Sequence, residues 1–470
     1  MKRNTHIWQK TLVSMVVSSL LLGGCALPVE QTSSGVSMPS GWGERGDQVK
    51  ISPEGVPNFS WWQRFGSTEL IEMVLLAQSG GYDVAAAAAR VRQADARARM
   101  AGASLLPEVT GNVNASRDKD VGEPSTRSYT MGLSASYEVD IWGEKRASRL
   151  SAMASRDAAV FAHDAVLLTL MASTAQSYLR TVAWRERVAI ARYNLTAAER
   201  VLGLVESRYR VGSASAQETA QQRTLVASLR QVLALRQQQE HQSLTTLAVL
   251  LGRPPQKLTV RAVSLSSMKA PTVESGLPTD LLTRRPDVAA AERRLAVADA
   301  DVTVARAAML PTVRLTATIG RGSDEVRDVP ENPIYNLAAG LVAPIFNNGR
   351  LAAGHDLSLA RREELLANYR SAIINSLGDV ENALNGLQGS ARQLEAHQEV
   401  LVHGREAVRL AESRYRSGSD TMQALLDTQR TLFQAQDLAV QLRLENLLAT
   451  IDLYKALGGG WRPKRMASSK

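Results

Sequence analysis

Cys25 is the residue with the clearest chemistry in this chain of 470 residues, and it is the only cysteine. It follows Leu-Leu-Gly-Gly at the end of an apolar run, Thr11 to Leu22, that is too short to cross a bilayer as a helix. Basic residues precede the run, and small residues before a lone cysteine are typical of a bacterial lipobox. We therefore expect residues 1–24 to be a lipoprotein signal peptide and the thiol of Cys25 to be acylated. A signal peptide with an unrelated cysteine is the alternative.

The residue after the cysteine, Ala26, indicates the membrane to which such a lipoprotein would be sorted. It stands where an aspartate would, by analogy with enterobacterial lipoproteins, retain the protein at the inner membrane. We therefore expect a lipid-anchored protein of the outer membrane of a Gram-negative bacterium. Because acyl chains alone give limited anchoring, a second attachment to the membrane lipid is also expected.

The other polar residues do not indicate an enzyme. None of the six histidines has metal-ligand spacing with another histidine or with Cys25, and GxxxxGK, GxSxG and HExxH motifs are absent from the sequence. We expect no catalytic residue, no metal and no cofactor. The 55 Lys and Arg residues are interspersed with 46 Asp and Glu residues along helical stretches, which indicates solvated faces and no nucleic-acid partner.

The chain contains an internal duplication. Asp83 to Val109 aligns with Asp287 to Val313 without a gap, and two further blocks follow in the same order in both halves. These blocks are VDIWGEKR against APIFNNGR, and ESRYRVGS (Glu206 to Ser213) against ESRYRSGS (Glu412 to Ser419). Each half should therefore build the same elements in the same order, giving internal pseudo-symmetry.

Each half contains one segment in which apolar and polar residues alternate. Tyr129 to Ile141 places its apolar residues on one face, and β-hairpins are predicted at about 107–142 and 311–346. Strands of about ten residues with this alternation are typical of transmembrane β-barrels, which need at least eight strands to close. Because one chain supplies only four, we expect several chains to share a barrel, and three would supply twelve strands. A soluble sandwich is the alternative, but it would need more strands.

Long helical segments follow each β-hairpin. Lys145 to Gly212 and Arg350 to Ser417 would each span roughly 100 Å as continuous helices. Each reaches a Gly-Ser turn and returns, which predicts helical hairpins at about 145–251 and 350–457. Apolar residues on two faces of the last helix, small ones on one seam, fit a helix packed between two neighbours around a channel. A solid bundle core is the alternative.

Several of these segments together resemble the TolC-like outer-membrane efflux factors, in particular the acylated NodT-type branch that includes OprM. The resemblance covers roughly Phe59 to Leu457. The resemblance rests on the segments FSWWQRFGSTEL, SYEVDIWGEKR, LLTRRPDVAAAERRLAVADADVTVARAAMLPTVRLTATIG, APIFNNGRLAA and the paired ESRYRxGS segments. It implies a mainly α-helical homotrimer whose twelve-stranded outer-membrane β-barrel is continued by a long periplasmic α-helical barrel.

The domain organisation follows from these elements. The signal peptide would be followed by an acylated tether and collar segment at 25–65, repeat 1 at 66–265, an interhalf linker in the collar at 266–282, repeat 2 at 283–457 and a tail at 458–470. Within the tether segment, the aromatic residues of Phe59 to Phe65 should pack against the body.

The resemblance implies a passive exit duct of a tripartite efflux pump. A periplasmic adaptor would connect the duct to an inner-membrane transporter of the RND or ABC type. A protein-secretion duct is a second interpretation, and a lipid-anchored coiled-coil scaffold is a third, although a scaffold leaves the β-hairpins unexplained. Drugs, dyes, metals and siderophores all remain possible substrates.

The resemblance also implies roles for residues near the Gly-Ser turns. The turns would lie at periplasmic tips where the adaptor docks; the residues assigned to docking are Tyr209, Arg210, Gly212, Ser213, Gly418 and Ser419. The residues assigned to a gate are Asp427, Glu218, Tyr415 and Arg416. Asp420 departs from the family, since some members carry a basic residue there. Three Asp427 carboxylates around an axis would repel one another and favour cations, although a solvated helix end is the alternative.

Overall fold

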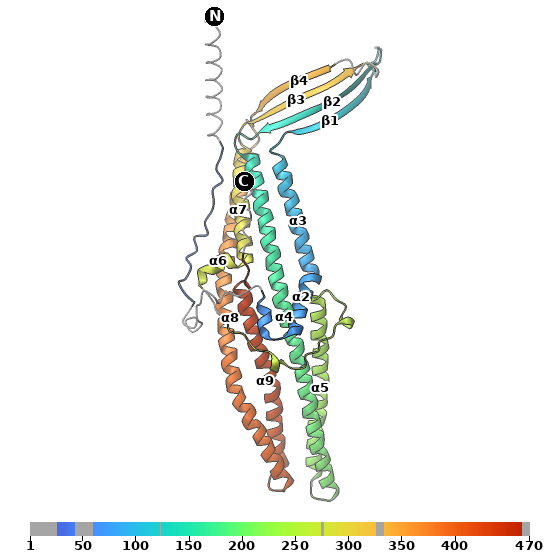
Figure 1. Cartoon of the computed structure of the whole chain (residues 1–470), viewed down its shortest axis with the longest axis vertical. Helices are drawn as coiled ribbons and strands as arrows, with labels where there is room; N and C mark the ends of the chain where they lie inside the picture. Colours follow the sequence, from blue (N-terminus) through green and yellow to red (C-terminus); the bar gives the residue numbers. More distant parts are fainter. Residues whose placement is uncertain (1–25, 43–59, 123, 274–276, 326–332, 463–470) are drawn as a thin grey trace. The chain divides into compact units, whose positions relative to one another are not determined.

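The computed structural model describes residues 26–42, 60–122, 124–273, 277–325 and 333–462 (Figure 1). Cys25 and the predicted signal peptide lie outside the described residues. The chain forms two compact units, and each unit combines segments from both halves of the duplication. Unit 1 comprises 1–35, 89–160 and 290–371, and unit 2 comprises 36–88, 161–289 and 372–470. Most of the described residues are helical, as expected for a mainly α-helical protein.

Unit 1 contains a four-stranded antiparallel sheet with the strand order β1-β2-β3-β4 (Figure 1). Its strands are β1 (Glu108–Asp118), β2 (Thr126–Val139), β3 (Thr312–Ser323) and β4 (Pro333–Val342). β1 and β2 come from the first half of the chain and β3 and β4 from the second, so each half supplies one hairpin. β2 pairs with β3 and joins the halves.

The register of the sheet sorts its residues by polarity. Val113 lies opposite Met131, Leu133 opposite Ile319, and Ala317 opposite Leu337. Because side chains alternate along each strand, these apolar residues share one face. The other face carries small and polar residues, among them Gly132 and Gly320, which face each other so closely that a Cβ on Gly132 would lie 2.8 Å from the carbonyl oxygen of Ile319. The predicted alternation is therefore present in all four strands.

The strands end earlier than the sequence suggested. β2 ends at Val139 and β4 at Val342, a few residues before the ends of the predicted hairpins at about 142 and 346. The indole Nε1 of Trp142 donates a hydrogen bond to the carbonyl oxygen of Pro311 at 2.7 Å, just before β3. Trp142 therefore packs at the base of the sheet, whereas Phe346 is exposed.

The N-terminal tether is held by helices of unit 1. The backbone N–H of Thr32 donates to Asp299 Oδ2 at 3.0 Å and its hydroxyl to Oδ1 at 2.6 Å, while Arg370 donates to the carbonyl oxygen of Ser34 at 2.7 Å. Nearer the sheet, the N–H of Leu27 donates to the carbonyl oxygen of Trp142 at 3.1 Å. The helices that enter this unit are α3 (Tyr82–Ala103), α4 (Glu144–Arg210), α7 (Pro286–Ala307) and α8 (Arg350–Arg416).

Unit 2 contains the two helical hairpins. α4 turns into α5 (Ala216–Leu250), and α8 turns into α9 (Met422–Ala456). Each turn has a glycine with positive φ, Gly212 at 78° and Gly418 at 74°, a conformation that side chains disfavour. The unit also holds η2 (Trp61–Phe65), α2 (Thr68–Gly80), α6 (Leu281–Arg284) and three short 3-10 turns, η3 (Pro255–Lys257), η4 (Leu265–Ser267) and η5 (Pro278–Asp280).

The aromatic segment before α2 is part of the core of unit 2, as predicted. Trp61 and Phe65 are fully buried, and Trp61 stacks on Tyr454 of α9 with ring centroids 5.2 Å apart. α4 is the one described helix long and apolar enough to cross a membrane by composition. Its residues Met171, Tyr178 and Leu179 are buried in this core, so core packing accounts for the apolar character.

Candidate functional site

The two hairpin tips have nearly the same backbone hydrogen bonds. In the first, the N–H of Gly212 donates to the carbonyl oxygen of Tyr209 at 3.0 Å, and that of Ser213 donates to Arg208 at 2.8 Å. In the second, Gly418 donates to Tyr415 at 3.1 Å, and Ser419 donates to Arg414 at 2.9 Å. These bonds satisfy carbonyl groups at the end of each long helix. The duplicated sequence therefore produces duplicated tips.

The starts of the returning helices differ. Ser215 and Glu218 form a capping box on α5: the hydroxyl of Ser215 accepts the N–H of Glu218 at 3.1 Å, and the carboxylate of Glu218 accepts the N–H of Ser215 at 2.7 Å. Thr421 caps α9 with a single bond from the N–H of Ala424 at 3.3 Å. Glu218 is thus engaged in its own tip, a contact that the gate assignment did not include.

An apolar cluster joins the hairpins near their tips. Val205 of α4 and Leu225 of α5 pack with Tyr415 of α8 and with Met422 and Leu425 of α9, and all are at most 4% exposed. Burial of this apolar surface favours a fixed arrangement of the two tips within one chain.

Tyr415 connects the two hairpins in this apolar cluster, and its contact with Arg208 is called the in-chain Arg–Tyr joint below. The Arg208 guanidinium lies 4.9 Å from the centroid of the Tyr415 ring, and its Nη1 donates to the Tyr415 carbonyl oxygen at 2.8 Å. A cation over an aromatic face is attracted by the ring quadrupole. Burial raises the pKa of Tyr415, and the nearby charge of Glu218 raises it further while Arg208 opposes both. The phenol is therefore neutral, and its oxygen is buried without a hydrogen-bond partner among the described residues.

The carboxylates and Arg416 make mainly local contacts. Asp427 is 57% exposed, accepts hydrogen bonds from Gln423 at 3.1 Å, and lies 4.0 Å from Arg430 on the same helix. Arg416 pairs with Glu412 one turn earlier on α8. Asp420 accepts the N–H of Thr421 at 2.8 Å and lies 3.4 Å from Arg414, so this acidic departure from the family is used within its own tip.

Tyr209 and Arg210 line an open groove on the first hairpin. Its volume is about 920 Å³, and its walls also include Glu206, Ala220 and Arg223. Tyr209 is 49% exposed, unlike its buried counterpart Tyr415. The structure therefore brings Tyr415 together with the first hairpin. Tyr209 and Arg210, which the sequence predicted to dock an adaptor, lie on an open surface of the single chain.

A second polar contact ties the hairpins together farther from the tips. Arg187 of α4 and Arg236 of α5 both pair with Asp437 of α9; the bond from Arg187 Nε is 2.7 Å and that from Arg236 is 3.0 Å. The two guanidinium groups also flank the ring of Trp184, at 4.3 and 5.5 Å. This cluster fixes α9 against both helices of the first hairpin.

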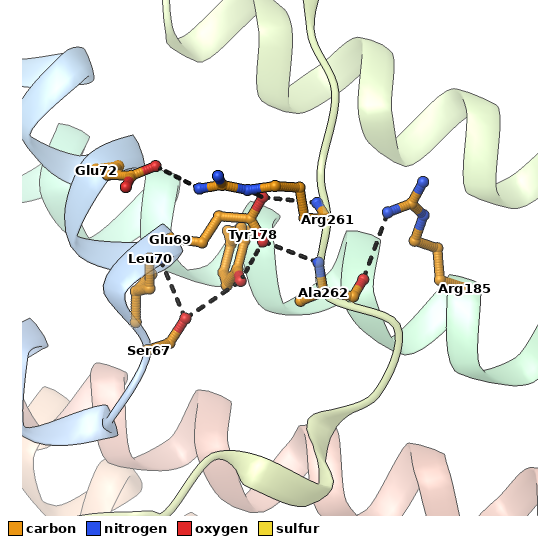
Figure 2. A network of polar contacts seen from close by, with 8 residues as sticks. All are labelled: Ser67, Glu69, Leu70, Glu72, Tyr178, Arg185, Arg261 and Ala262. Atoms are coloured by element: carbon orange, nitrogen blue, oxygen red, sulfur yellow. Dashed lines mark hydrogen bonds and ion pairs between the residues drawn. The ribbon is translucent and has the colours of Figure 1, made fainter.

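Glu69 organises a third polar cluster, shown in Figure 2. Its carboxylate accepts the backbone N–H groups of Arg261 at 2.6 Å and Ala262 at 2.9 Å, and the hydroxyl of Tyr178 at 3.0 Å. The Arg261 guanidinium lies 3.5 Å from Glu69 and donates to Glu72 at 2.8 Å. One carboxylate thereby joins α2, α4 and the segment that follows α5.

The charge of Glu69 is stabilised by these donors. Burial opposes ionisation, but the hydrogen bonds from Arg261, Ala262 and Tyr178 outweigh it and hold the pKa of Glu69 below its ordinary value. Burial raises the pKa of Tyr178, so the phenol stays protonated and donates. The cluster is therefore stable as a carboxylate with three neutral donors and one nearby guanidinium.

Sequence reasoning missed several of these residues. Ser215 had a signal, because serine followed three residues later by glutamate before a helix is the capping-box pattern. Glu218 was predicted as a gate residue, but its contact with Ser215 was not. Arg208 had a weaker one, the first arginine of the duplicated ESRYR segment. Glu69 and Asp437 had none, since their partners lie far away in the chain.

Comparison with known proteins identifies the class to which this fold belongs. Residues 75–253 and 277–459 match the outer membrane efflux protein family, and the chain belongs to that family. It is an outer-membrane efflux channel of a Gram-negative bacterium, and it belongs to a family of channels that work with adaptors and inner-membrane transporters. The predicted family, function and outer-membrane location are confirmed.

Particular relatives are similar over almost the whole chain. The pyoverdine export outer membrane protein OpmQ of Pseudomonas aeruginosa is 46% identical over 97% of this chain and 98% of its own length. OpmQ of Pseudomonas putida is 44% identical over 94% of this chain and 96% of its own length. Among solved structures, the open state of the Neisseria gonorrhoeae MtrE outer membrane channel has a TM-score of 0.84 at 27% identity, covering 93% of this chain and 98% of that one.

Proposed function

We propose that three copies of this chain form the exit duct of a tripartite efflux system that exports a siderophore. The three copies would share a twelve-stranded β-barrel in the outer membrane and a periplasmic α-helical barrel. The observation that carries this proposal is the four-stranded sheet, because it has one apolar face, one polar face and two unpaired edges.

The exposed apolar face of the sheet favours lipid contact. Val113, Met131, Ile319 and Leu337 lie on this face and are between 50% and 84% exposed. Such a surface is unfavourable in water and suits the hydrocarbon of a bilayer. The polar face would then line an aqueous lumen.

The open edges favour assembly with other copies. β1 and β4 are the edge strands, each pairing with one neighbour in the described chain. Unpaired backbone groups are too costly in a bilayer, so a membrane sheet must close on itself. Pairing of β4 with β1 of another copy closes the barrel after three chains.

The described part of the tether begins beside the segment that joins this sheet to α4. Leu27 is hydrogen-bonded to Trp142, and Ala26 lies beside Gly143, between the end of β2 and the start of α4. Acylation at Cys25 would add a second membrane attachment to that of the apolar sheet face.

The tips supply the candidate gate and the docking sites. Asp427 is exposed near the start of α9, where three symmetry-related carboxylates would favour cations and repel one another. Tyr415 and Arg416, with Glu218 in the opposite tip, would set the tip position. Tyr209, Arg210 and the two Gly-Ser turns would be offered to the adaptor.

The substrate class rests on the relatives. The OpmQ proteins of two Pseudomonas species are pyoverdine exporters, and both are at least 44% identical to this chain. Deletion of the gene should leave a siderophore in the periplasm and reduce it in the medium, as measured by chrome azurol assay and fluorescence. Undiminished siderophore export in the deletion strain would contradict the substrate class, and a strictly monomeric detergent extract would contradict the shared barrel.

A further inference from the structure

The tip of each hairpin has an equivalent residue in the other. The ungapped alignment of ESRYRVGS with ESRYRSGS pairs Arg208 with Arg414 and Tyr209 with Tyr415. Continued through the turns, it pairs the helix caps Ser215 and Thr421, which the structure independently shows as equivalent N-caps. Contacts made by one tip can therefore be compared position by position with those of the other.

Within one chain, only one of two possible Arg–Tyr joints is formed. Arg208 of the first hairpin stacks on Tyr415 of the second and donates to its carbonyl oxygen at 2.8 Å. The Tyr415 side chain is buried against Met422 and Leu426 of α9. The equivalent joint would unite Arg414 with Tyr209.

The side chain of Arg414 makes the same local contact as the side chain of Arg208. The Nη2 of Arg208 donates to the carbonyl oxygen of Ser213 at 3.3 Å, and the Nη2 of Arg414 lies 3.5 Å from that of Ser419. Arg414 is 63% exposed, however, because no second tip covers it in the single chain. Its Nε lies 3.4 Å from Asp420 in the same tip, and this contact leaves most of the guanidinium exposed.

Tyr209 provides the matching acceptor. It is 49% exposed in the groove of about 920 Å³ that also includes Ala216 and Ala220. In the alignment these two alanines are equivalent to Met422 and Leu426, which are buried in the in-chain joint. The groove on the first hairpin is therefore equivalent to the surface around Tyr415 on the second hairpin. Within the chain, the first hairpin covers that surface on the second.

We propose that Arg414 of one copy stacks on Tyr209 of the next copy and donates to its carbonyl oxygen. Tyr209 would then belong to the contact between copies, and Arg210 and the Gly-Ser turns would be left for the adaptor. This inference rests on the proposed trimer. The carbonyl oxygen of Tyr209 accepts the N–H of Gly212, and a second lone pair is free, as on Tyr415, which accepts both Gly418 and Arg208. In the proposed trimer, the Arg208–Tyr415 contact within each chain would alternate with the Arg414–Tyr209 contact between neighbouring chains.

The between-chain joint is the weaker of the two. Within the chain, Arg200 lies 3.6 Å from Glu412, a cross-hairpin ion pair. The equivalent positions are Glu406 and Glu206, which carry like charges. Each is neutralised inside its own hairpin, Glu406 by Arg409 at 2.6 Å and Glu206 by Arg223 at 2.8 Å. The boundary between copies therefore lacks this attraction and should separate first when the tips part.

Paired cysteines test this joint in the full-length protein in its membrane. The variant Tyr209→Cys with Arg414→Cys, treated with a short bifunctional thiol crosslinker, should give covalent dimers and trimers. The matched variant Arg208→Cys with Tyr415→Cys has the same geometry inside one chain and should be crosslinked without a ladder. The four single variants control for Cys25, and each should remain monomeric on a denaturing gel.

The outcomes separate this inference from the proposed function. A protein that light scattering shows to be a trimer, but whose Tyr209→Cys/Arg414→Cys variant gives no ladder while the in-chain pair reacts, would overturn the joint alone. A monomer by light scattering would overturn the trimer itself. A crosslink from position 209 to a different protein would assign the groove to that partner and also overturn the joint.

Discussion

Glu69 joins three segments of unit 2 through one buried carboxylate (Figure 2). We expect Glu69→Gln to lower the free energy of unfolding by about 1–3 kcal/mol at pH 7, because the buried donors lose a charged acceptor. Thermal unfolding of the detergent-solubilised protein measures this loss. Glu72→Gln is the matched control, since Glu72 is 60% exposed and contacts the same Arg261.

The effect of Glu69 should depend on pH with a defined sign. The pKa of Glu69 is lower in the folded chain than its ordinary value, so ionisation stabilises the fold above the ordinary pKa. This contribution is lost as the pH falls through the lowered folded-state pKa. The difference in stability between the wild type and Glu69→Gln should therefore shrink towards acid pH, and a difference that grew would contradict the assignment.

Asp427 is the residue for which a gate role can be measured directly. Asp427→Asn removes charge but keeps the shape, and we expect it to reduce cation preference or raise conductance of the channel in planar bilayers. Glu445→Gln is a matched control: Glu445 is exposed on the same helix and, like Asp427, accepts from a glutamine four residues earlier. Equal conductance and selectivity in the wild type and Asp427→Asn would remove Asp427 from the gate.

At the scale of elements, the two tips differ most in how their returning helices start. Ser215→Ala removes one hydroxyl of the capping box and should cost about 1 kcal/mol in the stability of α5 near its start. Hydrogen exchange of the amides at 216–220 measures this loss. Thr421→Ala removes a single cap bond from α9 and should have a smaller effect. Equal protection in the Ser215→Ala variant and the wild type would show that tertiary packing alone holds this end.

The elements were more predictable from the sequence than the contacts among them. The strict alternation of Tyr129 to Val139 has one physical solution, a two-faced strand, and the Gly-Ser turns mark where helices must reverse. The end of the first hairpin was placed too late because Ile141 continues the alternation of apolar residues, although β2 ends at Val139. Pairing of Arg208 with Tyr415 depends on how two hairpins meet, which local patterns do not encode.

At the scale of the molecule, the two compact units cut across the duplication. Each half of the sequence contributes strands to unit 1 and a helical hairpin to unit 2. The repeat therefore does not make two domains, because each compact unit combines segments from both halves of the chain. In the proposed trimer, three duplicated chains would take the place of six single-repeat chains. The sequence differences between the two tips would then distinguish contacts within a chain from contacts between chains.

Two membrane attachments are proposed for the whole molecule, a lipid on Cys25 and the apolar face of the sheet. Removing the lipid measures how much the sheet contributes alone. Cys25→Ala should abolish incorporation of labelled palmitate, because the only thiol of the chain is removed. The variant needs a signal peptide that does not require acylation, so that export itself is unaffected.

A single acyl chain binds membranes only weakly, whereas closing three sheets would bury a continuous apolar band in lipid. We therefore expect the unacylated chain to remain with the outer membrane on a sucrose gradient and to resist extraction by alkaline carbonate. Full release into the soluble fraction would mean that the lipid, and not the sheet, holds the protein in the membrane, and the shared barrel would have to be abandoned.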